Sequence, residues 1–234
     1  MAWGDAKSIL RDSTMVLAVF GPIAIFFLLF MLPLIEQMIW NRFNFDLIPY
    51  RLFGVSFLSL IPGMLFGMIY GFIMLDERDE DIISFISVTP LQKQGYLSYK
   101  LQIPMLLSSG FFLLFVYGTQ LIDLTAIHAP FIAVMVAMEA AIGALFLVAY
   151  ADNKVEGLAY SKMFGIIFLA VPAVFFWQSP WHWMIAWLPP FWIAKAFVHS
   201  TSGSWLVWTD LLIGVSIHFA CFLFFLRAFL NKQK

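Results

Sequence analysis

Residues 76–100, DERDEDIISFISVTPLQKQGYLSYK, decide how this chain is organised. The stretch holds five acidic and three basic residues, in a protein in which only 12% of residues are charged. It lies between two apolar runs that are each long enough to cross a membrane. The sequence therefore predicts an exposed loop between two membrane spans, and the loop has a role of its own.

This loop has the residue order of a short surface helix. Its carboxylates come first, where the positive end of a helix dipole stabilises them, and Pro90 stops the helix. An apolar helix face outside the bilayer has to be buried, either in a groove of a protein partner or on the membrane surface. The carboxylates favour the protein partner, because anionic lipid headgroups would repel them, and a lipid-lying helix is the alternative. The apolar face consists of Ile82, Ile83, Phe85 and Ile86.

The loop resembles the cytoplasmic loop of ABC-2 type transporter permeases, in which an acidic cluster leads into a short coupling helix. The acidic DERDE opening is most similar to the drug-export branch, which includes permeases described as fluoroquinolone exporters. The chain departs from the family pattern at Asp81, where the family usually has Gly. The resemblance covers essentially the whole chain and rests on Glu80, the apolar run, Val88-Thr89-Pro90, Tyr96 and Lys100.

The resemblance implies an exporter subunit that is driven by a separate ATPase subunit, which binds the ATP and Mg. No cofactor is expected in this chain. A second permease copy, or a related permease, is expected beside it in the membrane. The residues implied to contact the ATPase are Glu77, Glu80, Ile82, Ile83, Phe85, Ile86, Thr89 and Pro90.

The composition indicates an all-α polytopic membrane protein. Hydrophobic residues make up 62% of the chain and 27 of its 234 residues are Phe, more apolar surface than one soluble core of this size can bury. The net charge of −1 and the lack of a basic stripe argue against nucleic acid as a partner. The only cysteine, Cys221, lies in an apolar run, which excludes an intrachain disulfide.

Runs of about 20 apolar residues predict six transmembrane helices within one domain, residues 1–234. Lys and Arg gather in the segments that are inside if both termini are cytoplasmic, which predicts a multi-pass protein of the plasma (inner) membrane with that orientation. The first span is expected to be a retained anchor. The predicted spans are residues 14–35, 52–75, 101–122, 129–150, 160–178 and 205–227.

Two features of the first half of the chain predict local packing. Residues 3–13 are amphipathic and predict an interfacial elbow helix before the first span, with a frayed terminus as the alternative. In the second span, Gly63, Gly67 and Gly71 recur every four residues, which predicts close contact with another helix.

Residues 179–203 are too apolar for an ordinary loop, but Pro189-Pro190 and Lys195 argue against a seventh crossing. We expect an outer re-entrant helical hairpin before the last span. Seven of the nine Trp residues lie in or beside this segment, which is typical of the membrane interface. The resemblance implies that the hairpin closes the exit, and simple interfacial anchoring is the alternative.

Glu139 is the one carboxylate deep in a predicted span, about 15 Å below the outer boundary, where an unpaired charge costs about 3 kcal/mol or more. His218 falls at about 20 Å on the last span, so the two can meet if spans four and six are neighbours. A protonated Glu139 bonded to a helix backbone is an equal alternative, and a role in the transport path is the third.

The sequence contains no motif of a metalloprotease, serine hydrolase, calcium loop or P-loop. Energy for transport must therefore come from another polypeptide. The prediction is a membrane permease, and not an enzyme, that exports a hydrophobic or amphipathic substrate. The alternatives are an integral-membrane enzyme acting on a lipid-soluble substrate and an ATP-independent carrier.

Overall fold

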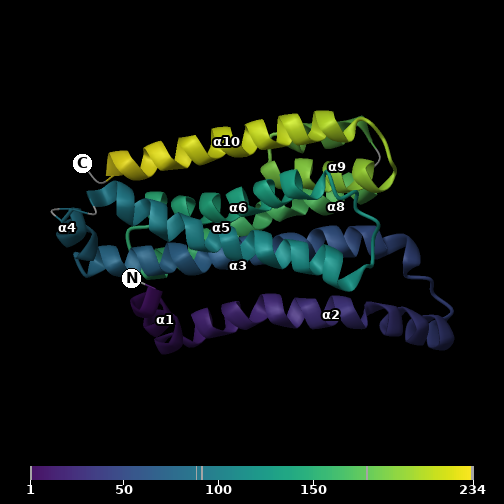
Figure 1. Cartoon of the computed structure of the whole chain (residues 1–234), viewed down its shortest axis with the longest axis horizontal. Coiled ribbons are helices and arrows are strands. Elements are labelled where there is room, and N and C mark those ends of the chain that lie inside the picture. The colour runs from purple at the N-terminus through teal and green to yellow at the C-terminus, as the bar shows by residue number, and fades with distance from the viewer. Residues whose placement is uncertain (1, 88, 91, 178, 233–234) are drawn as a thin grey trace.

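The computed structural model describes residues 2–87, 89–90, 92–177 and 179–232, and every regular element in this part of the chain is a helix. The long helices run side by side, and both termini lie at the same end of the bundle as α4 (Figure 1). In chain order the elements are α1 (Ala2–Arg11), α2 (Ser13–Phe43), η1 (Ile48–Tyr50), α3 (Arg51–Asp79), α4 (Ile82–Ser87), α5 (Gln92–Thr119), α6 (Ala129–Tyr150), α7 (Lys154–Ile166), η2 (Ile167–Leu169), α8 (Ala170–Phe176), η3 (Pro180–Ile185), α9 (Pro189–Thr201) and α10 (Val207–Lys232).

Six helical segments of the described chain are long and apolar enough to cross a membrane, which is the predicted number. The first is longer than predicted and runs from Ser13 to Phe43. The fifth is interrupted by the 3₁₀ turn η2 between α7 and α8. Pro172 explains this interruption, because proline cannot donate to the carbonyl four residues earlier and its ring clashes with that carbonyl.

Helix α6 forms the centre of the bundle and packs against α3, α5 and α10. Three of the four glycines of α3, Gly63, Gly67 and Gly71, face α6. A Cβ atom at Gly67 would lie 2.5 Å from the carbonyl oxygen of Ala140, and one at Gly63 would lie 3.1 Å from that of Val136. At Gly71 it would lie 2.8 Å from the side chain of Leu147. The missing side chains therefore allow the two backbones to approach closely.

Helix α2 is the peripheral span. Its buried residues are Met15, Pro22, Leu29 and Glu36, which recur every seven residues and so form one narrow stripe. The other faces of α2 are largely exposed and apolar, as expected for a helix that contacts lipid. At the far end of the stripe, the Arg51 guanidinium donates two hydrogen bonds to the Glu36 carboxylate, which joins α2 to α3.

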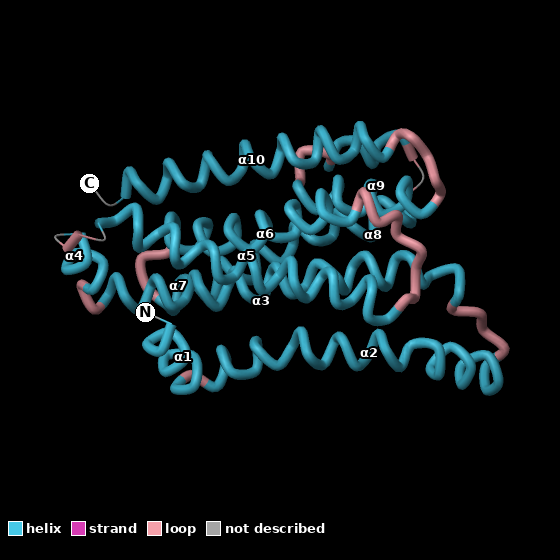
Figure 2. Tube along the Cα trace, viewed as in Figure 1, coloured by secondary structure: helices cyan, strands magenta, loops and turns pink. Residues whose placement is uncertain are grey.

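The segment before the last span turns back on itself (Figure 2). After α8 the chain continues as the 3₁₀ helix η3 and returns as α9, which has 13 residues and is about 20 Å long. This is too short for a bilayer core of about 30 Å. Helix α9 is buried against α8, α3, α6 and α10, and His199 at its end pairs with Asp210 of α10. Lys195 lies over the Trp183 ring, 4.8 Å from its centroid.

Candidate functional site

Helix α4 lies at the end of the bundle where the chain terminates, between α3 and α5 (Figure 1). Phe85 points away from the bundle and is 71% exposed, whereas Ile82 and Ile86 are half-buried. The Thr89 hydroxyl donates to the carbonyl of Ile86 at 2.7 Å and ends the helix. Pro90 is exposed, and Val88 lies outside the described residues.

Ile83 does not belong to the exposed surface of α4, where a contact with the ATPase was expected. This side chain is only 3% exposed and belongs to the main core of the helix bundle. The prediction that it inserts into a partner is wrong for this conformation, because α4 buries one of its apolar residues against its own chain. Phe85 is the large apolar side chain that α4 leaves free.

The acidic cluster also lies elsewhere than predicted. Asp76, Glu77 and Asp79 belong to the last turn of α3, so they sit at the negative end of a helix and not at the start of α4. Only Glu80 and Asp81 separate the two helices. The expected stabilisation by the α4 dipole is therefore absent for the first three carboxylates, and Asp76 and Glu77 pair instead with lysines of other helices.

The first of these cations is Lys100 of α5, whose side chain has 0% of its surface exposed. Its Nζ lies 2.5 Å from Asp5 of α1 and 2.7 Å from Glu77 of α3. The Tyr96 hydroxyl donates to the other Glu77 oxygen at 2.6 Å, and the Tyr99 hydroxyl donates to Asp5 at 3.2 Å. A buried charge needs this complete set of partners, because each missing one would leave a desolvated group. Each oxygen of the Glu77 carboxylate thus has a partner within this chain.

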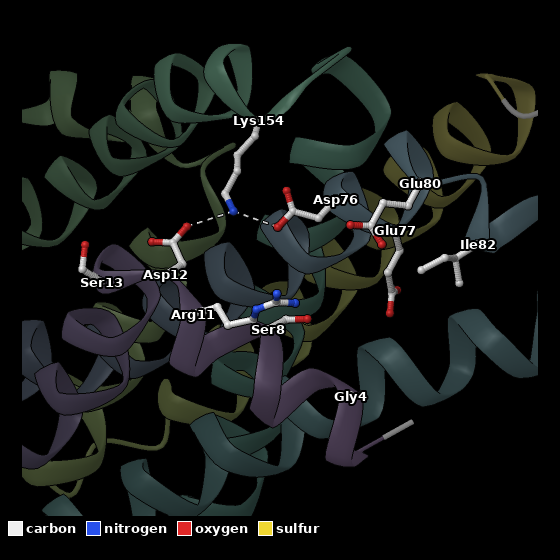
Figure 3. Close-up of a pocket in the computed structure, with 10 residues that line it drawn as sticks. All are labelled: Gly4, Ser8, Arg11, Asp12, Ser13, Asp76, Glu77, Glu80, Ile82 and Lys154. Carbon is white, nitrogen blue, oxygen red and sulfur yellow. Dashed lines mark hydrogen bonds and ion pairs between the residues drawn. The ribbon is translucent and has the colours of Figure 1, made fainter.

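The second cation is Lys154 at the start of α7. Its Nζ lies 2.9 Å from Asp12 and 2.7 Å from Asp76 (Figure 3). The hydrogen bond from Lys154 lowers the pKa of Asp12 below its ordinary value, which keeps this carboxylate charged. Asp12 also caps α2, because its side chain accepts from the backbone N–H groups of Thr14 and Met15. We call these six residues the two-lysine clamp: Asp5, Asp12, Asp76, Glu77, Lys100 and Lys154.

A polar cavity of about 570 Å³ lies between α1 and the end of α3, beside the start of α4. Arg11 extends into it from α1, and Glu80 and Ile82 form the wall nearest α4 (Figure 3). Neither Arg11 nor Glu80 forms an ion pair with another described residue. The cavity therefore offers charges of both signs beside the start of α4.

Two further cations hold this end of the bundle together. The Arg78 guanidinium donates to the carbonyls of Val148 and Ala151 at the end of α6, at 3.1 and 2.8 Å. Lys232 of α10 donates to the same Ala151 carbonyl and pairs with Asp152. Cations are favourable at a helix C-terminus, where carbonyls lack partners within the helix. The pairing with Lys232 lowers the pKa of Asp152.

Inside the bundle, the structure brings Glu139 of α6 and His218 of α10 together. His218 Nε2 lies 3.4 Å from Glu139 Oε1, and neither side chain has exposed surface. His218 Nδ1 is 2.7 Å from the Gly214 carbonyl, so Nδ1 carries a proton and donates. Within the described residues neither carboxylate oxygen of Glu139 nor Nε2 of His218 forms a hydrogen bond, and no group of three or more metal-ligating residues occurs.

Comparison with known proteins places these features in a family. The family of the "Fluoroquinolones export permease protein Rv2686c-like" proteins matches residues 5–226. The chain belongs to this family. The chain is 27% identical, over 98% of its length and 92% of theirs, to two proteins of Mycobacterium tuberculosis, the "Fluoroquinolones export permease protein MT2760" of strain CDC 1551 / Oshkosh and the "Fluoroquinolones export permease protein Rv2686c" of strain ATCC 25618 / H37Rv. No solved structure matches it.

Several residues of this site could not be predicted from the sequence. Tyr96 and Lys100 stand out as parts of the loop pattern, but nothing in that pattern gives their partners. Asp5 and Asp12 look like ordinary polar residues of an amphipathic helix. Their seven-residue spacing would put both on one side of a continuous helix, but in the structure Asp12 follows the end of α1 and has extended backbone.

Asp81 has φ of 58°, in the left-handed region. This is the position at which the export permease departs from the expected Gly, and glycine adopts this conformation without a steric penalty. We expect Asp81→Gly to leave stability unchanged or raise it by up to about 1 kcal/mol, and Asp81→Val to lower it by about 1–2 kcal/mol. Hydrogen exchange of the α3–α4 turn measures the effect. Equal exchange rates in the two variants would show that the turn is not strained.

Proposed function

We propose that this permease is the membrane subunit of an ATP-driven ABC-2 type exporter and that a separate ATPase binds at α4. The observation that carries the proposal is the exposed Phe85 on a short helix outside the spans, at the end of the bundle that also holds both termini. The family supports export as the activity. An apolar side chain of this size in water favours a partner that buries it.

ATP and Mg would be bound by the ATPase, because the chain contains no P-loop motif. The pathway would be formed with a second permease copy or a related permease. The names of the relatives point to a fluoroquinolone as cargo, and the broader class is a hydrophobic or amphipathic molecule. The short helix α9 and η3 would form the re-entrant closure of the exit.

We further propose that the protein lies in the plasma membrane with α4 and both termini in the cytoplasm. The bias of Lys and Arg toward this end supports that orientation. A native-mass measurement on gently solubilised complexes should find two permeases with two ATPases. A lone subunit or a simple oligomer would favour a membrane enzyme or an ATP-independent carrier.

The docking proposal predicts the effect of Phe85→Asp. Burial of a Phe side chain contributes about 1.5–3 kcal/mol, and 1.4 kcal/mol is about tenfold in affinity. We therefore expect association with the ATPase to weaken at least about tenfold and transport to be lost, while the permease still folds and inserts. Surface-immobilised permease in nanodiscs and purified ATPase provide the measurement.

Phe43→Asp is the matched control for this experiment. Phe43 is 69% exposed and ends α2 at the opposite end of the bundle. Phe43→Asp therefore makes the same substitution at a site far from the proposed ATPase contact. We expect ATPase affinity to be unaffected by it. An unchanged affinity in Phe85→Asp, or an equal loss in both variants, would contradict docking at α4.

A further inference from the structure

The two-lysine clamp connects α1 to three other helices. Asp5 lies in α1 and Asp12 follows its last residue, seven positions and about 10 Å along the helix. Each of these carboxylates shares a lysine with a carboxylate of α3, and the α3 pair is formed by the neighbours Asp76 and Glu77. The lysines come from α5 and α7. Neither lysine-bearing helix can leave this group without breaking an ion pair.

Lys100 is the stronger of the two links between α1 and α3. Its side chain has no exposed surface, so water cannot replace either carboxylate if one of them moves away. Removing one partner from a buried ion pair is far more costly than shifting the whole group together. Asp5, Glu77 and Lys100 therefore move as one unit. Lys154, whose side chain is 33% exposed, holds the other end of α1 less tightly.

The clamp also surrounds the helix on which the proposed docking takes place. Helix α4 follows α3 after two residues and is joined to α5 by residues 88–91. Glu77 and Lys100 lie on these two flanking helices. A displacement of α4 therefore acts on the helix ends that carry the clamp, and Asp5 must follow them.

Helix α1 passes such a displacement on to α2. A single residue, Asp12, separates the two helices, and it is both a member of the clamp and the cap of α2. Helix α2 contacts the bundle along one narrow stripe and contains Pro22 and Pro33. It is thus a span with little packing to resist a change of tilt.

We propose that the two-lysine clamp couples α4 to α2, so that its carboxylates and lysines are positioning residues for transport. This inference rests on the proposed function, because it needs an ATPase at α4. In this proposal, α1 transmits a displacement of α4 to α2. The ion pairs of Asp5 and Asp12 are what couple α1 to that displacement.

The test is the double variant Asp5→Asn/Asp12→Asn. Asparagine keeps the size and the hydrogen-bond acceptor of each side chain, and it caps a helix as well as aspartate does. The Lys100–Glu77 and Lys154–Asp76 pairs remain. Permease and ATPase in proteoliposomes provide ATPase affinity, ATP hydrolysis and transport of a fluorescent fluoroquinolone. We expect unchanged affinity and hydrolysis, with at least about a fivefold fall in substrate moved per ATP hydrolysed.

The control is Asp46→Asn/Asp123→Asn, which removes the same charge from two exposed residues away from the clamp. It should transport like the wild type. An unchanged transport-to-hydrolysis ratio in the clamp variant would overturn the proposal, and so would a loss of ATPase affinity as large as the loss of transport, since transport would then fail for want of docking. Some loss of thermal stability is expected, because Lys100 loses one of its two carboxylates. If the double variant does not fold, the same measurements on Asp5→Asn alone decide. A wild-type permease that binds no ATPase would instead refute the proposed function.

Discussion

A Gly67→Leu variant is expected not to fold into a monodisperse protein. The first carbon of any side chain at this position would lie 2.5 Å from the carbonyl oxygen of Ala140 and 3.0 Å from its Cα. These are backbone atoms of the central helix, so a rotamer change cannot relieve the contact, and α3 would have to move away from α6. We expect a loss of at least about 3 kcal/mol in the free energy of unfolding.

Gly110→Leu provides the matched control. Gly110 lies in α5, another spanning helix, and a Cβ atom there meets nothing within 4 Å. The same substitution should therefore leave folding intact. Size-exclusion profiles and thermal unfolding in detergent compare the two variants directly. Equal profiles would show that the close approach of α3 and α6 is not required.

The second large effect is expected at the buried pair of Glu139 and His218. Replacing His218 with Leu leaves a carboxylate with no exposed surface and no hydrogen-bond partner among the described residues. Loss of one member of a buried pair costs about 3–5 kcal/mol. Glu139→Leu should also destabilise the protein, because Nε2 of His218 loses its only polar neighbour within the described bundle.

A double-mutant cycle separates the interaction from simple overpacking or cavity effects. We expect Glu139→Leu/His218→Leu to be more stable than either single variant, because no polar group is then left unpaired. If the changes in the free energy of unfolding of the two single variants simply add in the double variant, Glu139 and His218 do not interact. Glu139→Gln should keep both fold and transport, since its amide can donate to Nε2. If it folds and binds the ATPase but does not transport, Glu139 belongs to the transport path.

The pair illustrates how far sequence reasoning reaches in a membrane protein. Counting residues gave similar depths for Glu139 and His218, because each residue of a helix adds a fixed rise. The bilayer also imposes a length and an apolar composition on every span, so the number of spanning helices follows from local composition. The contact itself required α6 and α10 to be neighbours, and that is a property of the packed bundle.

The loop of residues 76–100 shows the limit of the same reasoning. Its apolar residues and its Pro90 predict a short helix, and α4 is present. The sequence could not assign Ile83 to the core and Phe85 to the outside, because a helix of six residues has an apolar face whose direction depends on what packs against it. Nor could it assign Asp76 to the end of α3, since both the end of one helix and the start of the next were compatible with the same residues.

The sequence by itself thus determined the class of protein, its six candidate spans and the family to which its loop pattern points. These properties depend on composition and on spacing along a single helix, which are local quantities. Only the tertiary structure decided that Glu77 is bound within the chain and that α1 is fastened to α3, α5 and α7. Asp5 and Lys100 are 95 residues apart, and the energy of burying a charge depends on which distant groups surround it in the folded chain.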